Sequence, residues 1–347
     1  MHTDEQELTP RERRVLEAVI HTFVDTAAPA ASRAVARDFD LGVSPATVRN
    51  TMSDLARKGY LTQAHPSAGR TPTDKAYRYY VDTLMKIEEL SADEVAQVLA
   101  TVGGETSAEQ ELLSRAVLAL SVLTHELGLG LGPQIGGGVL ERIELVGLSS
   151  ERMLIVLAID SGPVRTIYVE APRPVTDEVL SSLAQFLNER LAGRGLREIR
   201  ETYRDRLSDG PTEHADLLNI FLEQADTAFA THPPVDSVVL GPASSLADQP
   251  EFANREGLRT LIELTEQKEL LARALDARSA EGIVISIGGE HDQQRLLDFS
   301  LVTTQYEMAG VRGTIGVMGP TRMPYERVVA LVQYTADLLS SLPDRSD

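Results

Sequence analysis

The segment Leu41–Met85 constrains the fold of this chain more strongly than any other stretch, because local signals mark a helix start, a helix end and a hairpin in close succession. Ser44 is a residue type that caps a helix start, and Pro45 suits the first helical position, where no N–H is needed. Gly59 suits the left-handed turn that ends the helix. At helical spacing, one side of this helix is apolar and should pack inward through Val48, Met52 and Leu55.

A hairpin is expected directly after this helix. Tyr60–Gln63 has the pattern of a short strand, and His65–Pro72 contains the prolines and the glycine that favour a hairpin tip. Upstream, Pro10–Thr26 and Ser32–Phe39 have apolar residues at helical spacing, and Leu41–Val43 forms a tight turn before the next helix. Three helices and a hairpin in this order are the layout of a winged helix-turn-helix domain.

The polar side of the third helix predicts contact with DNA. Arg49 and Asn50 lie on this side, and both residue types can bridge a base edge with two hydrogen bonds. Arg70, placed on the hairpin tip, could reach a phosphate or a minor groove. For Lys75 and Arg78, phosphate contact and simple solvation are both open. The predicted DNA-binding residues are Ser44, Thr47, Arg49, Asn50, Ser53, Arg57, Arg70, Lys75 and Arg78.

The distribution of charge agrees with a small basic surface on an acidic protein. The chain has a net charge of −19, which taken alone is the wrong sign for a DNA-binding protein. Residues 1–85 carry 11 basic and 11 acidic residues, so the whole negative charge belongs to residues 86–347. Within 44–80 there are six basic and two acidic residues. Repulsion from the acidic remainder should discourage contact with DNA anywhere but through this basic segment.

The sequence shows no pattern typical of catalysis, metal binding or membranes. It has no cysteine, its seven histidines lack metal-ligand spacing, and no Gly-x-Ser-x-Gly motif is present. Gly128–Gly138 is expected to be a loop that lacks the Gly-Lys-Ser/Thr ending of a phosphate-binding loop, and Gly288–Glu290 is expected to be a structural turn. No apolar run reaches the ~20 residues of a membrane span. We therefore expect a cytoplasmic protein that is not an enzyme and needs no cofactor or metal.

Beyond residue 85, the pattern indicates one α+β sheet with a long helical insertion. A polar helix is expected over 86–99, a flexible joint over 101–107 and an amphipathic helix over 109–127. Strands are expected at 142–148, 153–159, 164–170, 282–287, 299–306 and 313–318. Further helices fit 176–192, 213–230, 257–277 and 325–342. Each group of strands is too small for a stable unit alone, which favours a single sheet.

Two motif blocks resemble the HrcA family of heat-inducible transcription repressors. Gly42–Asn50 and Ser67–Thr73 match, position by position, the family's Gly-Val-Ser-Pro-Ala-Thr-Val/Ile-Arg-Asn helix and its Ser-Ala-Gly-Arg-x-Pro-Thr wing. The second block comprises IGGE at 287–290 and the stretch 296–329. Thr26–Ala31 departs from the family, in which this loop would contain glycines. The resemblance covers nearly the whole chain, although 171–280 matches by layout more than by motif.

The resemblance implies an α+β multidomain fold. An N-terminal winged helix-turn-helix domain would occupy 1–90 and a linker 91–107. A GAF-like α+β domain would comprise 108–172 and 280–347, interrupted by a mainly helical dimerising insertion at 173–279. The Leu- and Ile-rich helices of the insertion have more apolar surface than the core requires, which places the expected dimer contact on them.

The resemblance also implies a function. The chain would be a negative regulator of heat-shock (chaperone) genes that binds an inverted-repeat operator in double-stranded DNA as a homodimer. The chaperonin would modulate its activity, heat stress would abolish it, and the protein would be nucleoid-associated when bound. One alternative is a transcription factor controlled by a small-molecule effector in the GAF-like domain. A second alternative is an enzyme that uses the 282–320 block.

Overall fold

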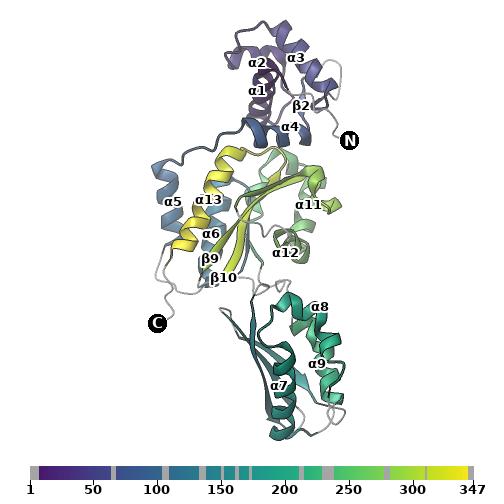
Figure 1. Ribbon diagram of the computed structural model, residues 1–347. Coiled ribbons are helices and arrows are strands. Elements are labelled where there is room, and N and C mark those ends of the chain that lie inside the picture. Colours follow the sequence, from purple (N-terminus) through teal and green to yellow (C-terminus); the bar gives the residue numbers. More distant parts are fainter. Residues whose placement is uncertain are drawn as a thin grey trace.

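The computed structural model describes residues 8–63, 68–103, 109–132, 138–149, 152–160, 164–171, 174–210, 215–228, 238–276, 282–308 and 311–342. These residues form three units that follow one another along an elongated molecule (Figure 1). We call them the head (8–84), the central domain (92–132 and 238–342) and the inserted domain (138–228). The head lies at one end and the inserted domain at the other, with the central domain between them.

The head has the expected winged helix-turn-helix layout. Its elements are α1 (Pro10–Thr26), α2 (Ser32–Asp38), α3 (Pro45–Arg57), the strands β1 (Leu61–Thr62) and β2 (Thr71–Pro72), α4 (Asp74–Tyr79) and the π-helical turn η1 (Tyr80–Leu84). A capping box starts α1, because the Thr9 side chain accepts from the Glu12 N–H and the Glu12 carboxylate accepts from the Thr9 N–H. The three helices predicted from the sequence pattern are confirmed.

The central domain is built on a five-stranded antiparallel sheet in the order β7-β3-β10-β9-β8. Its strands are β3 (Leu127–Leu131), β7 (Val238–Leu240), β8 (Val284–Ile287), β9 (Phe299–Met308) and β10 (Val311–Pro320). The helices α5 (Ala92–Val102), α6 (Glu109–Thr124) and α13 (Tyr325–Ser341) cover one face. On the other face lie α10 (Ser244–Ala247), the short η5 (Pro250–Phe252), α11 (Arg255–Glu266) and α12 (Lys268–Asp276). This arrangement is consistent with a GAF-like fold.

The glycine-rich segment after α6 corrects one prediction. Its first part is not a loop but β3, an interior strand between β7 and β10. Gly128 and Gly130 face α6, where a Cβ on Gly130 would meet the side chains of Leu113 and Val117. A Cβ on Gly128 would meet the Val117 carbonyl. Glycine is therefore required so that α6 packs directly on the strand, and residues 133–137 of the segment lie outside the described residues.

The expected linker over 91–107 is also largely wrong. The polar helix predicted from residue 86 begins only at Ala92, because Ser91 and Glu94 form a capping box there. The resulting α5 packs against α6 and buries Val98 and Val102. Only 85–91 runs as an extended connection between head and central domain, and residues 104–108 lie outside the described part of the chain.

The inserted domain corrects the single-sheet prediction and the insertion boundaries. The meander forms its own three-stranded sheet from β4 (Leu140–Ser149), β5 (Arg152–Ile159) and β6 (Arg165–Glu170). One face of this sheet packs on α7 (Asp177–Leu191), α8 (Leu196–Arg206) and α9 (Ala215–Ala228) in a separate hydrophobic core. The helices at 255–276, which the expected insertion included, pack on the central sheet instead. Strands and helices both belong to this domain, whose described residues begin at 138 and end at 228.

The apolar faces of the inserted helices are buried within one chain. Leu180, Leu183, Leu187 and Leu191 of α7 are all at most 2 % exposed. No described residue of α7, α8 or α9 is an exposed large apolar residue, whereas α11, part of the helix expected at 257–277, exposes Leu258 and Ile262. In the inserted domain, exposed apolar residues lie on the outer face of the β4–β6 sheet, among them Val146, Leu148 and Tyr168.

Candidate DNA-binding surface

Local interactions define the start and end of α3. The Ser44 side chain accepts a hydrogen bond from the Thr47 N–H at 3.2 Å, and the two hydroxyl groups lie 3.0 Å apart. Pro45 occupies the first turn, where it removes an N–H that would lack a partner. After Lys58 the chain turns through Gly59 with φ +82°, a conformation that favours glycine. The helix thus begins and ends as the sequence predicts.

One side of α3 anchors it and the opposite side is exposed. Val48, Met52 and Leu55 are buried against α1 and α2, as predicted, together with Thr51. Arg49 and Asn50 are exposed, and no hydrogen bond or ion pair joins their side chains to any described residue. A rigid helix that presents a free guanidinium and a free amide side by side has the donors and acceptors needed to read base edges in a major groove.

The other predicted residues of α3 have partners within the helix. The Ser53 hydroxyl donates to the Arg49 carbonyl at 3.0 Å. Arg57 forms an ion pair with Asp54, and both side chains are well exposed. A surface pair of this kind is weak, so Arg57 can exchange Asp54 for a phosphate at little cost. Ser44, Thr47, Arg49, Asn50, Ser53 and Arg57 are therefore brought together along one helix.

Arg70 lies in the connection between the two strands of the wing. β1 and β2 pair antiparallel, and Arg70 directly precedes β2, on the loop side of the hairpin. Its backbone pairs with Ala30, with N–O distances of 2.9 and 2.8 Å. Gly69 permits this contact, because a Cβ there would meet the carbonyls of Pro29 and Ala30. The Arg70 side chain is half-buried, and its Nε is buried without a hydrogen-bond partner in the described residues; the tip, 64–67, lies outside them.

Lys75 supports the end of α3. Its Nζ donates to the Lys58 carbonyl at 3.2 Å and lies 4.6 Å from the centroid of the Tyr60 ring. A cation at the carbonyl end of a helix is favourable because the helix dipole is negative there. Lys75 is exposed as well, so it keeps donors for a phosphate while it holds the helix end.

Arg78 is separated from the other predicted residues. Its guanidinium points to the central domain, where it makes a two-point ion pair with Glu290 and donates to the Ile285 carbonyl at 2.7 Å. Asp82 contacts the same guanidinium at 3.1 Å. The structure therefore gives Arg78 a contact between domains, which sequence reasoning missed because its partners lie more than 200 positions away.

A second residue that sequence reasoning missed is Lys58. It adds to the basic count of the head, but its Nζ lies 2.7 Å from Oε1 of the nearly buried Glu12. The Thr9-x-x-Glu12 capping box was a usable signal, since it places a carboxylate at the start of α1. Lys58 is therefore a poor candidate for phosphate contact.

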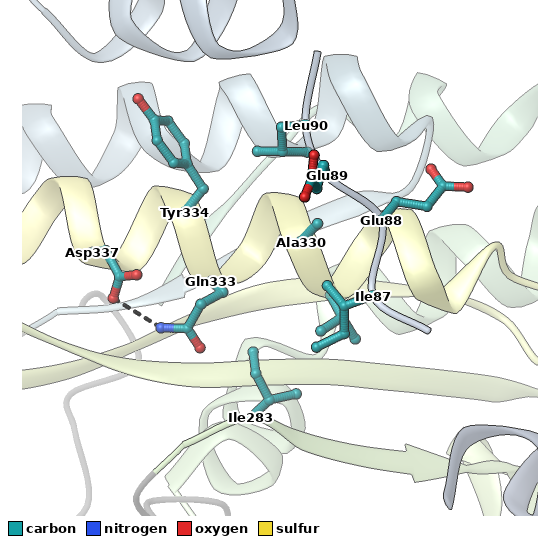
Figure 2. A pocket seen from close by; sticks show the side chains of 10 residues that line it. Ile87, Glu88, Glu89, Leu90, Ile283, Ala330, Gln333, Tyr334 and Asp337 are labelled. Atoms are coloured by element: carbon teal, nitrogen blue, oxygen red, sulfur yellow. Dashed lines mark hydrogen bonds between the residues drawn. The ribbon is translucent and has the colours of Figure 1, made fainter. Parts of the chain in front are cut away.

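A groove on the central domain is the feature relevant to an effector. It has a volume of about 380 Å³ and lies between the extended segment 87–90, α13 and Ile283 (Figure 2). Its floor is apolar, with Leu90, Val329 and Ala330, and Glu88, Glu89 and Asp337 also line it. Gln333 donates to Asp337 at 2.8 Å along the same wall. Such a lining suits an apolar or cationic molecule better than an anion.

Two properties of the described residues bear on other functions. No group of three or more His, Cys, Asp or Glu side chains in that part of the chain is arranged to hold a metal ion. None of its helices is both long enough and apolar enough to cross a membrane.

Comparison with protein families gives two matches. Residues 7–85 match the model described as "Winged helix-turn-helix transcription repressor, HrcA DNA-binding", and residues 110–329 match "HrcA protein C terminal domain". Curated proteins named heat-inducible transcription repressor HrcA match over almost their whole length. The protein of Chlorobium phaeobacteroides (strain DSM 266 / SMG 266 / 2430) is 37% identical over 97% of this chain and 98% of its own. That of Prosthecochloris aestuarii is 38% identical over 96% of this chain and 97% of its own.

Among solved structures, the crystal structure of a hypothetical protein has the same fold over nearly the whole chain. It superposes with a TM-score of 0.57 at 22% identity and covers 96% of this chain and 98% of that one. Together, the two family matches and the full-length relatives account for the winged helix and for the domains behind it. The chain belongs to the HrcA family of heat-inducible transcription repressors.

Proposed function

We propose that this protein binds an inverted-repeat operator in double-stranded DNA through α3 and thereby represses heat-shock genes. The observation that carries the proposal is the pair Arg49 and Asn50, exposed and unpaired among the described residues, on a helix whose other side is anchored in the head. Ser44, Thr47, Ser53, Arg57, Arg70 and Lys75 would add polar and phosphate contacts. Repression needs no catalysis, so we propose no enzymatic activity and no cofactor. Gel shift with promoter fragments of chaperone genes tests the proposal.

We propose further that the protein acts as a homodimer and that the outer face of the β4–β6 sheet forms the contact. The strand register aligns Val146, Leu154 and Tyr168 in one row across the three strands. Tyr168 is 77% exposed and Val164 60%. A sheet with one face on its core usually presents polar residues on the other, so an apolar row favours burial against a partner. A two-fold axis would pack this row against itself.

Sedimentation of a charged variant tests the dimer contact. Tyr168→Asp should convert the dimer to a monomer, because the new carboxylate would be buried without a partner. Leu258→Asp on α11 is the matched control, since Leu258 is also an exposed apolar residue, on another domain. If Tyr168→Asp remains a dimer, the contact lies on another surface. If the wild-type protein is already a monomer, the proposed dimer is wrong.

The regulatory part of the proposal is supported by the family resemblance and by the names of the relatives. We propose that heat abolishes operator binding and that the chaperonin assists the protein in reaching its active form. A cytoplasmic location, on the chromosome when bound, belongs to the same proposal. Gel shift after heating and return to low temperature, with and without purified chaperonin and ATP, tests it. Recovery of binding only with chaperonin supports this part of the proposal, and equal recovery without it contradicts it.

The groove beside α13 favours one alternative, in which a small effector controls DNA binding. Its apolar floor and its three carboxylates are described above. A ligand that binds the folded state raises its melting temperature, so a thermal-shift screen with apolar amines would detect such an effector. A compound that raises the melting temperature and also changes operator affinity would support this alternative.

A further inference from the structure

The head is joined to the central domain by a directional contact between Arg78 and Glu290. Nε of Arg78 lies 2.7 Å from Oε1 of Glu290, and Nη2 lies 2.5 Å from Oε2. Nη2 also donates to the Ile285 carbonyl at 2.7 Å. A guanidinium that meets a carboxylate at two points fixes orientation as well as distance. This contact therefore restricts how α4 can rotate on the central sheet.

The turn that carries Glu290 is shaped for this contact. Glu290 accepts a hydrogen bond from the Ile287 N–H at 2.9 Å, which holds its carboxylate in place. The Gly289 N–H donates to Oδ2 of Asp74 at 2.9 Å. Gly288 has φ +47°, and a Cβ there would collide with the Asp74 carboxylate. Asp74 and Arg78, one helical turn apart on α4, thus hold the 288–290 turn from two sides.

A second point of attachment lies at the end of α1. Nη1 of Arg322 donates to the Val24 carbonyl at 2.6 Å. The same guanidinium is held by Glu251 at 2.7 and 3.0 Å and by Gln249 at 2.8 Å. The buried rings of Tyr77 and Tyr325 also pack between head and central domain, with centroids 5.9 Å apart. Apolar packing is not directional, so the two polar attachments are what fixes the angle, and loss of either widens the range of angles that the head can adopt.

The attachments leave the DNA-binding side of the head open. α3 lies at the far end of the head from the central domain (Figure 1). The contact therefore cannot act by covering α3. What it controls is the direction in which α3 points.

We propose that the contact of Arg78 and Asp74 with the 288–290 turn positions the head, so that the two heads of a dimer meet two half-sites at a fixed spacing. This inference rests on the proposed function, because it requires a dimer and a two-half-site operator. A tethered second head binds at an effective concentration that depends on how well the tether matches the spacing. A head free to pivot samples many spacings, so binding to the second half-site weakens while each head still recognises DNA.

The test combines one distance measurement with one binding measurement. Because the chain contains no cysteine, Arg37→Cys on the exposed side of α2 provides a single spin-label site per protomer. Pulsed dipolar spectroscopy then reports the head-to-head distance in the dimer. Gel shift uses duplexes with one and with two half-sites, cut from the promoter region that footprinting protects.

Three variants disturb the contact and one is a control. Glu290→Gln removes the charge, Arg78→Lys keeps a charge but removes the two-point geometry, and Gly288→Ala displaces Asp74. The control is Glu263→Gln, which breaks the Arg259–Glu263 pair on α11, at 2.6 Å, remote from the head. Melting temperature confirms that each variant is folded.

The three variants should broaden the head-to-head distance distribution and weaken two-half-site binding by about tenfold or more. Their half-site affinity should equal that of the wild type and of Glu263→Gln. An unchanged distribution and unchanged two-half-site affinity in folded Glu290→Gln and Arg78→Lys would overturn the inference, and so would tighter binding. A wild-type protein with no inter-head distance or no half-site binding would instead contradict the proposed function, and the inference with it.

Discussion

Lys58 and Glu12 form an ion pair, with Nζ 2.7 Å from Oε1, that ties the end of α3 to the first turn of α1. Glu12 also closes the capping box with Thr9, so one carboxylate serves both the start of α1 and the position of α3. Lys75 holds the same helix end through the Lys58 carbonyl. The direction of α3, the helix proposed to read DNA, is therefore set by charged groups as well as by its apolar side.

Glu12→Gln should reduce the free energy of unfolding by about 1–3 kcal/mol at neutral pH. Burial by itself raises the pKa of Glu12, but the hydrogen bonds from Lys58 and Thr9 outweigh it, so its pKa lies below the ordinary 4.5. Because the pKa is lowered on folding, ionised Glu12 stabilises the folded state above pH 4.5, and this stabilisation is lost as the pH falls through the pKa of Glu12 in the folded protein. Urea unfolding at pH 7 and below pH 4.5 should show the difference between wild type and Glu12→Gln shrinking with acid. A difference that is constant over this range would contradict the assignment.

Arg49→Ala and Asn50→Ala should each weaken operator binding by roughly 1–3 kcal/mol, because each removes a base-edge contact. Binding to unrelated DNA should change much less, since phosphate contacts supply most of that affinity. Competitive gel shift measures both affinities. Arg259→Ala on α11 is the control, and wild-type operator affinity in both α3 variants would show that this helix does not read bases.

Arg70 and Arg78 should differ in their effect on the salt dependence of half-site binding. Arg70→Ala should reduce the slope of log affinity against log salt by about one, as expected for the loss of one phosphate contact. Arg78→Ala should leave the slope unchanged, because its guanidinium is engaged by Glu290 on the central domain. Affinity titrations at several salt concentrations on a one-half-site duplex make the comparison. Equal slopes for Arg70→Ala and the wild type would show that Arg70 contacts no phosphate.

Ala27→Gly should stabilise the protein by about 0.5–1 kcal/mol. Ala27 ends α1 with φ 51° and ψ 17°, a left-handed conformation in which a Cβ is unfavourable. The loop in which glycines were expected thus has an alanine at the position whose backbone conformation favours glycine. Ala28→Gly is the control: its φ is not positive, so the substitution should be neutral or destabilising. A melting temperature of Ala27→Gly below that of the wild type would contradict the inference that the Ala27 backbone is strained.

Features determined by neighbours in sequence could be predicted. Ser44, Pro45 and Gly59 defined α3, and the spacing of Val48, Met52 and Leu55 identified its buried side. Each of these signals depends on residues within a few positions, where capping, backbone freedom and helical periodicity decide the conformation.

Features that depend on distant partners could not be predicted. Among the described residues, the meander at 140–170 pairs with no strand of the central sheet. Its alternation of apolar and polar residues does not indicate which sheet it joins. The pairing of the Arg70 backbone with Ala30, 40 positions away, has no local signal either. Arginine is a residue type that commonly contacts phosphate, but the Arg78 guanidinium contacts Glu290 on the central domain. The neighbours of Arg78 in the sequence do not reveal this partner.

The most direct test of the account is a footprint of the purified protein on the promoter DNA of the chaperone genes. We predict protection of two half-sites related by a two-fold axis, with the centres one helical turn or a multiple of it apart. Arg49→Ala should lose this protection at concentrations that saturate the wild type, while Arg259→Ala should retain it. Protection of a single site without two-fold symmetry, or an identical footprint from Arg49→Ala, would contradict the claim that a dimer reads an inverted repeat through α3.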